Sequence, residues 1–140
     1  MANYLTSGKN NFYVEIDGHK FTNFISVSEI KGTAQVIHDI GGQDKIARKI
    51  PTKVTYDDIT FVRNADPNDM ELKKWFKTVI DNRVERKSMS IIIMDQGFNE
   101  KRFNMYECFP SNHSISSLNS QETGALQETI VIAFENGEWA

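Results

Sequence analysis

The sequence is short of covalent and conformational constraints: it has one cysteine, Cys108, and three prolines among its 140 residues. One cysteine cannot form a disulfide within the chain, so synthesis in a reducing compartment fits this composition. A chain of this length can bury a sizeable core without help from disulfides or metals. We therefore expect a single domain over residues 1–140.

Long apolar runs and a basic excess are also missing. The longest apolar run is Ile91–Met94, which is far too short to cross a bilayer. The first residues show no basic stretch followed by an apolar one, so we expect no secretory signal and no stable membrane insertion. The net charge of −3 does not indicate nucleic-acid binding, for which a basic chain is typical.

Alternating apolar and polar residues predict a chain that is mostly β. Asp17-Gly18 is typical of a two-residue hairpin turn after the first strand, and Asp95-Gln96-Gly97 is expected to be a later turn. Pro110 is expected to end a strand ahead of a polar loop over residues 111–124, and Asn136-Gly137 to end the last strand. Strands are predicted at residues 12–16, 20–28, 33–38, 57–63, 88–94, 101–109 and 126–134.

One helix is predicted, over Pro67–Asp81. Asp66 supplies an acidic cap, proline lies in the first turn, and apolar residues recur at helical spacing from Met70 to Ile80. The segment Gln43–Tyr56 is basic and poor in apolar residues, so we expect a long loop or an extended hairpin there. The expected architecture is mainly β: an antiparallel barrel of split-barrel or sandwich type, closed or nearly closed, with one packed α-helix.

A thiol nucleophile is the first candidate for chemistry, because Cys108 is followed by His113 and several small polar residues. Reactive cysteines lie beside positive charges or at helix N-termini, which lower the thiol pKa. Cys108 instead lies in a strand pattern next to Glu107, whose charge would raise that pKa. The pattern favours a buried cysteine in a strand that runs into a polar loop.

Other catalytic and metal sites find no support in the spacing of the residues. His19, His38 and His113 are scattered and show no ligand spacing. Asp57 and Asp58 are adjacent on a predicted strand, so their side chains point to opposite faces. No glycine-rich phosphate loop is present. We expect no catalytic residue, no metal and no cofactor.

Two polar features indicate assembly instead. Strand alternation puts small polar residues on one water-facing wall, although the opposite parity is also possible. The members of this wall are Ser26, Ser28, Thr33 and Gln35. A basic segment is either a solvated loop or an arm that pairs with an acidic patch on another copy. Its members are Lys45, Arg48, Lys49 and Lys53. A small sheet protein must also manage its open edges, and joining them between copies gives closed rings.

The order of several motifs points to a family. The opening FYVEIDG is followed by ISVSEI, VIHDIGG and RKIPTKVTYDDITFVRNA, and FNMYECFPSN and SLNSQETGALQETIVIAFENG come near the end. From about Phe12 to Asn136 this order resembles the tail tube proteins of contractile phages and the related inner-tube proteins of contractile injection systems. Glu29, Thr52 and Asn64 stand where glycine is common in that family, which affects the local turn shapes.

The resemblance implies a hexameric, ring-forming β barrel whose rings stack into a hollow tube that a sheath drives through a target membrane. It implies no catalysis and assembly in the bacterial cytoplasm. The implied partners are other copies, a sheath, baseplate, spike and tube-terminating proteins, and a protein or DNA cargo in the lumen. The polar wall would face the lumen, and the long loop over Ile40–Tyr56, with its four basic residues, would help to stack rings. The alternatives are a baseplate-proximal tube initiator, a type VI secretion tube protein, a Cys/His enzyme and a secreted effector.

Overall fold

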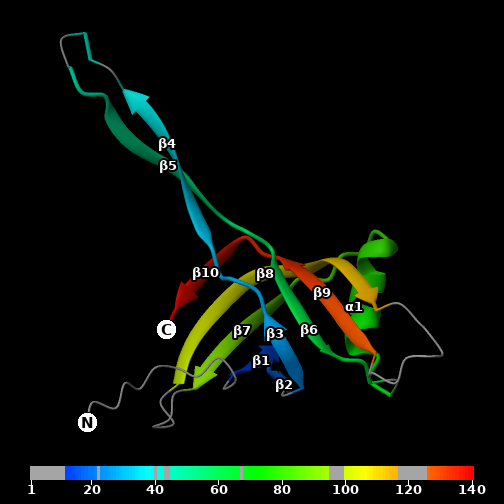
Figure 1. The fold of residues 1–140 in the computed structure, drawn as a ribbon. Helices are drawn as coiled ribbons and strands as arrows, with labels where there is room; N and C mark the ends of the chain where they lie inside the picture. Colours follow the sequence, from blue (N-terminus) through cyan, green and yellow to red (C-terminus); the bar gives the residue numbers. More distant parts are fainter. Residues whose placement is uncertain are drawn as a thin grey trace, which may run out of the picture.

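A β body with one helix and a long two-stranded arm make up the computed structural model (Figure 1). It describes residues 12–21, 23–39, 41–42, 45–66, 68–94, 100–116 and 126–140. The body contains β1 (Phe12–Ile16), β2 (His19–Phe21), β3 (Phe24–Val27), β6 (Ile59–Asn64), α1 (Glu71–Ile80), β7 (Lys87–Met94), β8 (Glu100–Ile115), β9 (Gln127–Ala133) and β10 (Asn136–Trp139). The arm consists of β4 (Gly32–Asp39) and β5 (Arg48–Tyr56).

The body is one antiparallel sheet in the order β2-β1-β7-β8-β9-β6-β3, and β10 also pairs with β8. The first half of β8 pairs with β7 on one side and with β10 on the other, whereas its second half, from Phe109 on, pairs with β9. Strand β8 therefore joins two parts. We call β2, β1, β7, the first half of β8 and β10 wing A, and the second half of β8 with β9, β6 and β3 wing B.

The predicted class, mainly antiparallel β with one helix, is confirmed, but a closed barrel is wrong for the described residues. No strand ladder joins β2 to β3 within them, so the sheet has two open ends. The reason is that the strand expected over residues 20–28 is two strands, which belong to different wings. The two ends still approach each other, since the rings of Phe21 and Phe24 lie 6.3 Å apart.

The core fills the space between the wings. Inward-facing residues alternate with outward-facing ones along β1, β6 and β9, as half-buried strands require. A β-bulge in β3 changes the expected alternation there, because Phe24 and Val27 both pair with inward-facing residues of β6. The core members are Val14, Ile16, Phe24, Ile59, Phe61, Leu72, Trp75, Met89, Ile91, Phe103, Met105, Cys108, Ile130, Ile132 and Phe134.

The helix begins later than predicted. Asp66 accepts a hydrogen bond from the Asn68 amide at 3.0 Å, so it forms a turn and does not cap the helix. Asp69 accepts from the amide of Glu71, the first helical residue, also at 3.0 Å. The Pro67 end of the prediction lies outside the described residues. Leu72 and Trp75 bury the inner face of α1, and Trp75 Nε1 donates to the carbonyl of Glu85 at 2.6 Å.

Two predicted strand ends are wrong. Strand β8 continues through Pro110 to Ile115, because the pairing with β9 shifts register between Pro110 and Asn112, and proline is tolerated at such a bulge. Asn136-Gly137 begins β10 and does not end the sheet. The predicted turn at residues 95–97 and the rest of the loop over residues 117–124 lie outside the described residues.

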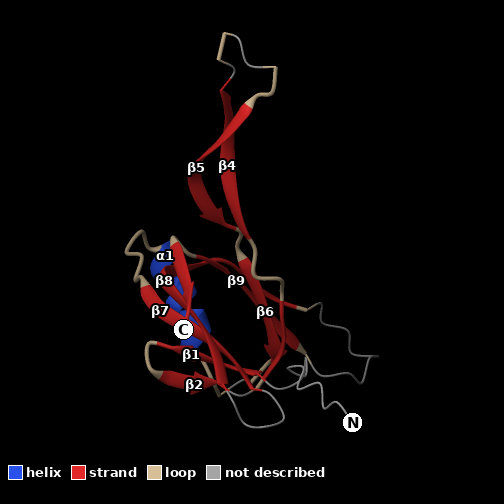
Figure 2. Cartoon of the chain, turned by 90° about the vertical axis from the view of Figure 1, so that its left-hand side faces the viewer, coloured by secondary structure: helices blue, strands red, loops and turns tan. Residues whose placement is uncertain are grey.

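The arm stands clear of the body (Figure 2). The extended-hairpin alternative is therefore the right one for the basic segment, although Ile40, Gln43 and Asp44 lie outside the described residues. At its base the Tyr56 hydroxyl donates to the carbonyl of Gly137 in β10 at 3.1 Å. Beyond that base the arm has only its own two strands, and such a pair is marginally stable alone.

Gly137 offers a test of this junction. A Cβ built on it would lie 2.4 Å from Phe103 Cζ, so Gly137→Ala must displace a buried aromatic ring. We expect a loss of about 1–3 kcal/mol in the free energy of unfolding, as for other overpacked cores. Gly42→Ala, where no atom lies within 4 Å of the new Cβ, is the matched control. Equal stability of the two variants in urea would contradict the packing described.

Candidate assembly surfaces

The thiol candidate is buried in the core. Cys108 is 0% exposed and pairs with Lys87 across β7 and β8. Burial raises the pKa of its thiol to about 12, and the charge of Glu107 acts in the same direction. At neutral pH the thiol is therefore protonated and a poor nucleophile.

A direct prediction follows for Cys108. In the native protein the thiol should react with a maleimide or with Ellman's reagent at least about a hundredfold more slowly than in the denatured chain, because it is both inaccessible and protonated. Labelling followed by mass spectrometry measures the two rates. Fast, stoichiometric labelling of the folded protein at pH 7 would contradict the burial of this side chain.

His113 belongs to a buried polar cluster that pattern reading missed. Arg63 is 0% exposed; its Nε donates to Glu128 Oε1 at 2.6 Å and its Nη1 to Asp69 Oδ2 at 2.7 Å. His113 Nε2 lies 2.6 Å from Glu128 Oε2, and its ring stacks on Phe76 of α1 at 6.0 Å. The cluster therefore ties the start of the helix to β6, β8 and β9. The signal was available, because Arg63 and Glu128 occupy inward positions of the predicted strands.

The charges of this cluster are matched by hydrogen bonds. Burial alone would raise the pKa of the Asp69 carboxyl, but hydrogen bonds from the Glu71 amide and the Arg63 guanidinium lower it. Burial alone would lower the pKa of the Arg63 guanidinium, but hydrogen bonds to Asp69 and Glu128 outweigh burial and raise that pKa. Arg63 Nη2 has no partner. Among the described residues, this cluster included, no group of three or more His, Cys, Asp or Glu side chains could hold a metal ion.

The outer face of wing B carries small side chains without charge. One row across the four strands is Ser28, Thr60, Val131 and Asn112. The next row is Ser26, Val62, Thr129 and Ser114. Asn64, Gln127 and Ser116 continue this face toward the end of β6. At the other end Asp58 accepts a hydrogen bond from Ser111. Of the four residues of the predicted polar wall, Ser26 and Ser28 lie on this face.

Wing A presents a different outer face. A row across its five strands contains Lys20, Glu15, Ser90, Asn104 and Glu138. Charged groups pair on this surface: Arg102 Nη1 lies 2.8 Å from Glu15 Oε2. The two wings therefore differ in chemistry, one charged and one uncharged. Sequence alternation alone does not show this contrast, because it does not say which strands are neighbours.

The other predicted residues lie on the arm. Thr33 and Gln35 are on β4 and are not part of the uncharged face of wing B. Arg48, Lys49 and Lys53 are on β5, and Lys45 lies near the tip. Residues 32–56 hold four basic and two acidic residues, a net charge of +2, which leaves −5 for the rest of the chain.

Large apolar side chains on the arm are exposed. Ile46 is 82%, Val54 61% and Ile37 52% exposed. Ile37 and Ile50 are cross-strand neighbours, as are Ala34 and Val54, so both faces of the hairpin carry apolar groups. Exposed apolar patches of this kind mark surfaces that other proteins cover. The arm therefore combines a basic charge with apolar contact surface.

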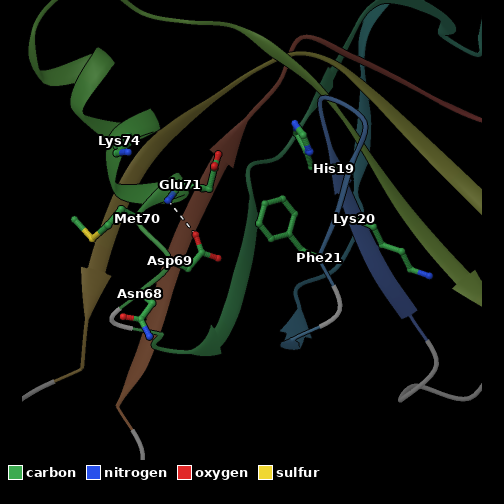
Figure 3. A pocket seen from close by; sticks show the side chains of 8 residues that line it. All are labelled: His19, Lys20, Phe21, Asn68, Asp69, Met70, Glu71 and Lys74. Atoms are coloured by element: carbon green, nitrogen blue, oxygen red, sulfur yellow. Dashed lines mark hydrogen bonds between the residues drawn. The ribbon is translucent and has the colours of Figure 1, made fainter.

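A cleft of about 440 Å³ lies between β2 and the start of α1. Its lining residues are His19, Lys20, Phe21, Asn68, Asp69, Met70, Glu71 and Lys74. Figure 3 shows Phe21 directed from β2 toward the helix, with Glu71 and Asp69 on the opposite side.

The one helix of the described residues is not long and apolar enough to cross a membrane.

Open sheet edges, an uncharged outer face and a projecting apolar arm define a class of protein, namely a subunit built to assemble with further copies. Comparison with known proteins names the family. Residues 8–138 match the model of the T4-like virus tail tube protein gp19 family, and the chain belongs to that family. The family match confirms the resemblance seen in the motifs. The function of the protein is that of a structural tube subunit. No curated protein matches the chain.

Solved structures share the fold. A chain of the PVC extracellular contractile injection system, in its extended sheath–tube complex, has a TM-score of 0.85 at 20% identity, covering 99% of this chain and 93% of that one. A chain of the anti-feeding prophage cap has a TM-score of 0.87 at 18% identity, with 100% and 94% covered. Hcp1 from Flavobacterium johnsoniae has a TM-score of 0.63 at 17% identity, with 93% and 94% covered.

Proposed function

We propose that six copies join side by side into a ring, that rings stack into a hollow tube, and that the tube is a passive conduit with no catalytic site. The observation that carries this proposal is the uncharged outer face of wing B, which runs without interruption from one open sheet edge to another. Strand β3 forms one edge, and the second half of β8 forms the other, because β7 pairs only with the first half.

The strand directions in wing B support a ring. Its four strands alternate in direction, so β3 and β8 run antiparallel to each other. When copies related by rotation about an axis along the strands stand side by side, β3 of one copy meets β8 of the next with antiparallel polarity. Because each copy supplies an even number of alternating strands, the antiparallel pairing can continue around a closed ring. The contact of β3 with β8 of the next copy is head-to-tail, the kind that gives rings.

The chemistry of wing B supports its place at the lumen. Serine, threonine, valine and asparagine are short and uncharged, so they offer neither ion pairs nor deep pockets to a passing molecule. We therefore assign Ser26 and Ser28, with the rows they belong to, to the lumen wall. Thr33 and Gln35 fall outside that wall, on the arm. A protein or DNA cargo would slide along a surface that holds neither by charge.

The remaining surfaces are available for other partners. The basic apolar arm, with Lys45, Arg48, Lys49 and Lys53, would contact the neighbouring ring. A sheath, a baseplate with its spike and a tube-terminating protein complete the machine that such a tube needs. The PVC structure named above comes from a sheath–tube complex, and the prophage structure from a tube-terminating cap. We place the protein in a phage tail or an extracellular injection particle that is assembled in the cytoplasm.

The lateral junction gives the test. Ile25 lies on edge strand β3 and is 47% exposed, so Ile25→Lys adds a charge at the proposed contact without touching the core. We expect the wild type to form rings of six 16.0-kDa copies and the variant to remain monomeric in native mass spectrometry. Ile80→Lys, on an exposed helix position (65%), is the matched control and should form rings. Rings of Ile25→Lys as stable as those of the control would refute the junction.

A further inference from the structure

The cleft between β2 and α1 has no part in the ring or the lumen wall proposed above. Its two sides come from the open end of wing A and the first turn of the helix. The arm leaves the body where β9 turns into β10, and β2 and the start of α1 lie toward the opposite end (Figure 1). When copies stack with one orientation, the arm of one therefore points to the end of the next that carries the cleft.

We propose that the cleft is the receptor for the arm tip of a copy in the adjacent ring. This inference rests on the proposed stacking of rings and adds the site where the arm binds. The occupant is the segment around Ile46, the most exposed of the large apolar side chains in the described residues. Lys45 and Lys49 flank it in the sequence.

The apolar part of the fit comes from Phe21 and Met70. Phe21 is half-buried on β2 and points across the cleft, and Met70 is 44% exposed at its rim (Figure 3). An isoleucine side chain seated against Phe21, with Met70 at the rim, would remove apolar surface of both copies from water. Buried apolar anchors surrounded by polar groups are the usual centres of binding energy at protein interfaces.

The charged part of the fit comes from Glu71 and Asp69. Glu71 is exposed at the cleft, and Asp69, whose side chain is 23% exposed, is held in place by Arg63. Lysines on either side of Ile46 would meet these carboxylates at the rim. The lining also holds Lys20, Lys74 and His19, so the cleft is selective for the placement of the charges and not for net charge alone. At the level of the whole chain, an arm of +2 meets a body of −5.

The same geometry explains why the arm can be both apolar and exposed in a single copy. A two-stranded hairpin cannot bury both its faces, so its isoleucines need a surface outside the chain. Each copy carries the arm and this cleft at opposite ends. The contact between an arm and a cleft is therefore heterologous, because it joins two different surfaces. A heterologous contact that does not close into a ring repeats without limit along an axis.

A charge exchange tests the receptor. We expect Glu71→Lys to lower the yield of stacked tubes at least tenfold while rings persist, and Lys49→Glu to do the same. Combining Glu71→Lys with Lys49→Glu should restore tubes to within about threefold of the wild type, because the pair is then reversed. Glu85→Lys makes the same charge change at an exposed position in the segment after the helix, and should leave tube yield unchanged. Negative-stain electron microscopy counts tubes, and native mass spectrometry counts rings.

The outcomes separate the two proposals. If wild-type rings stack and Glu71→Lys forms tubes as abundantly as the wild type, the cleft is not the receptor for the arm tip, and the proposed tube still stands. A double variant no better than its parents would lead to the same conclusion. Rings that never stack in the wild type would overturn ring stacking itself, and the cleft with it.

A cysteine pair gives a second measurement. Ile46→Cys and Met70→Cys in one chain should form disulfides between copies under oxidation, giving a ladder of covalent multimers on a non-reducing gel. Each single variant should give none, since buried Cys108 does not take part. A ladder absent from assembled tubes of the double-cysteine variant would overturn the contact even if the charge variants behave as expected.

Discussion

Replacing Arg63 by methionine should remove about 3–5 kcal/mol from the free energy of unfolding. The guanidinium is fully buried between Glu128 and Asp69, at 2.6 and 2.7 Å. Without it, the Glu128 side chain, which is 1% exposed, loses the guanidinium that pairs with its Oε1, and the contact with His113 remains. An uncompensated buried charge of this kind costs several kcal/mol. That is a large share of the 5–15 kcal/mol typical of a domain, so urea unfolding will show it.

Arg86→Met is the matched control for this prediction. Arg86 pairs with Glu135 at 3.0 Å, but both side chains are largely exposed (41% and 64%), and such pairs contribute at most about 1 kcal/mol. The double change Arg63→Met with Glu128→Leu removes both buried charges and should regain part of the loss. Equal destabilisation by Arg63→Met and Arg86→Met would show that the cluster is not buried as described.

Acid should weaken the same cluster. The pKa of Asp69 is lower in the folded chain than its usual value, so its stabilisation is fully present above that usual value. It is lost as the pH falls through the usual carboxyl range, about 4, and on through the folded pKa. Because Asp69 joins the helix start to Arg63, loss of its charge should loosen α1 first.

Charging the arm should have the second large effect, on assembly and not on folding. Ile37→Asp combined with Ile50→Asp places two charges on a cross-strand pair whose side chains are 52% and 40% exposed. Assembly into tubes should need at least about tenfold more protein, since the loss of about 1.4 kcal/mol per contact changes a dissociation constant tenfold. Analytical ultracentrifugation over a concentration series measures the shift.

The free energy of unfolding shows whether the arm variant loses assembly contacts or loses folding stability. In the described part of the chain the arm contacts the body near its base, at Tyr56 and β10. The paired arm variant should therefore unfold within about 0.5 kcal/mol of the wild type, as surface changes usually do. Ile80→Asp with Val84→Asp is the control and should assemble normally; Ile80 is the last helical residue and Val84 follows the helix, and they are 65% and 44% exposed. Normal tubes from the arm variant would show that the exposed isoleucines are not assembly contacts.

Strand alternation predicted the parts of the fold that depend on local burial. The strands around Phe61 and Ile130 were predicted because each alternates clearly, and the strand around Ile91 because its apolar run fits a central strand. The break between β2 and β3 was missed because nothing local says that the two halves of residues 20–28 pair with different wings. The extension of β8 past Pro110 was missed because a proline usually ends a strand, and only the bulge opposite β9 makes it acceptable.

The candidate surfaces show the same limit. Ser26, Ser28, Thr33 and Gln35 were grouped by parity, which gives the face of a strand but not its sheet. The fold separates the first two, on wing B, from the last two, on the arm. The cleft beside Phe21 could not be predicted from the sequence, because its sides come from segments about fifty residues apart.

A cryo-electron microscopy reconstruction of the purified, assembled particle tests the central claim most directly. It should show stacked six-fold rings around a channel, with the rows of Ser26 and Ser28 facing inward and β3 of each copy paired with β8 of the next. A particle whose channel is lined by the charged face of wing A, with Glu15 and Arg102 facing inward, would contradict this account. So would a chain that remains strictly monomeric at high concentration.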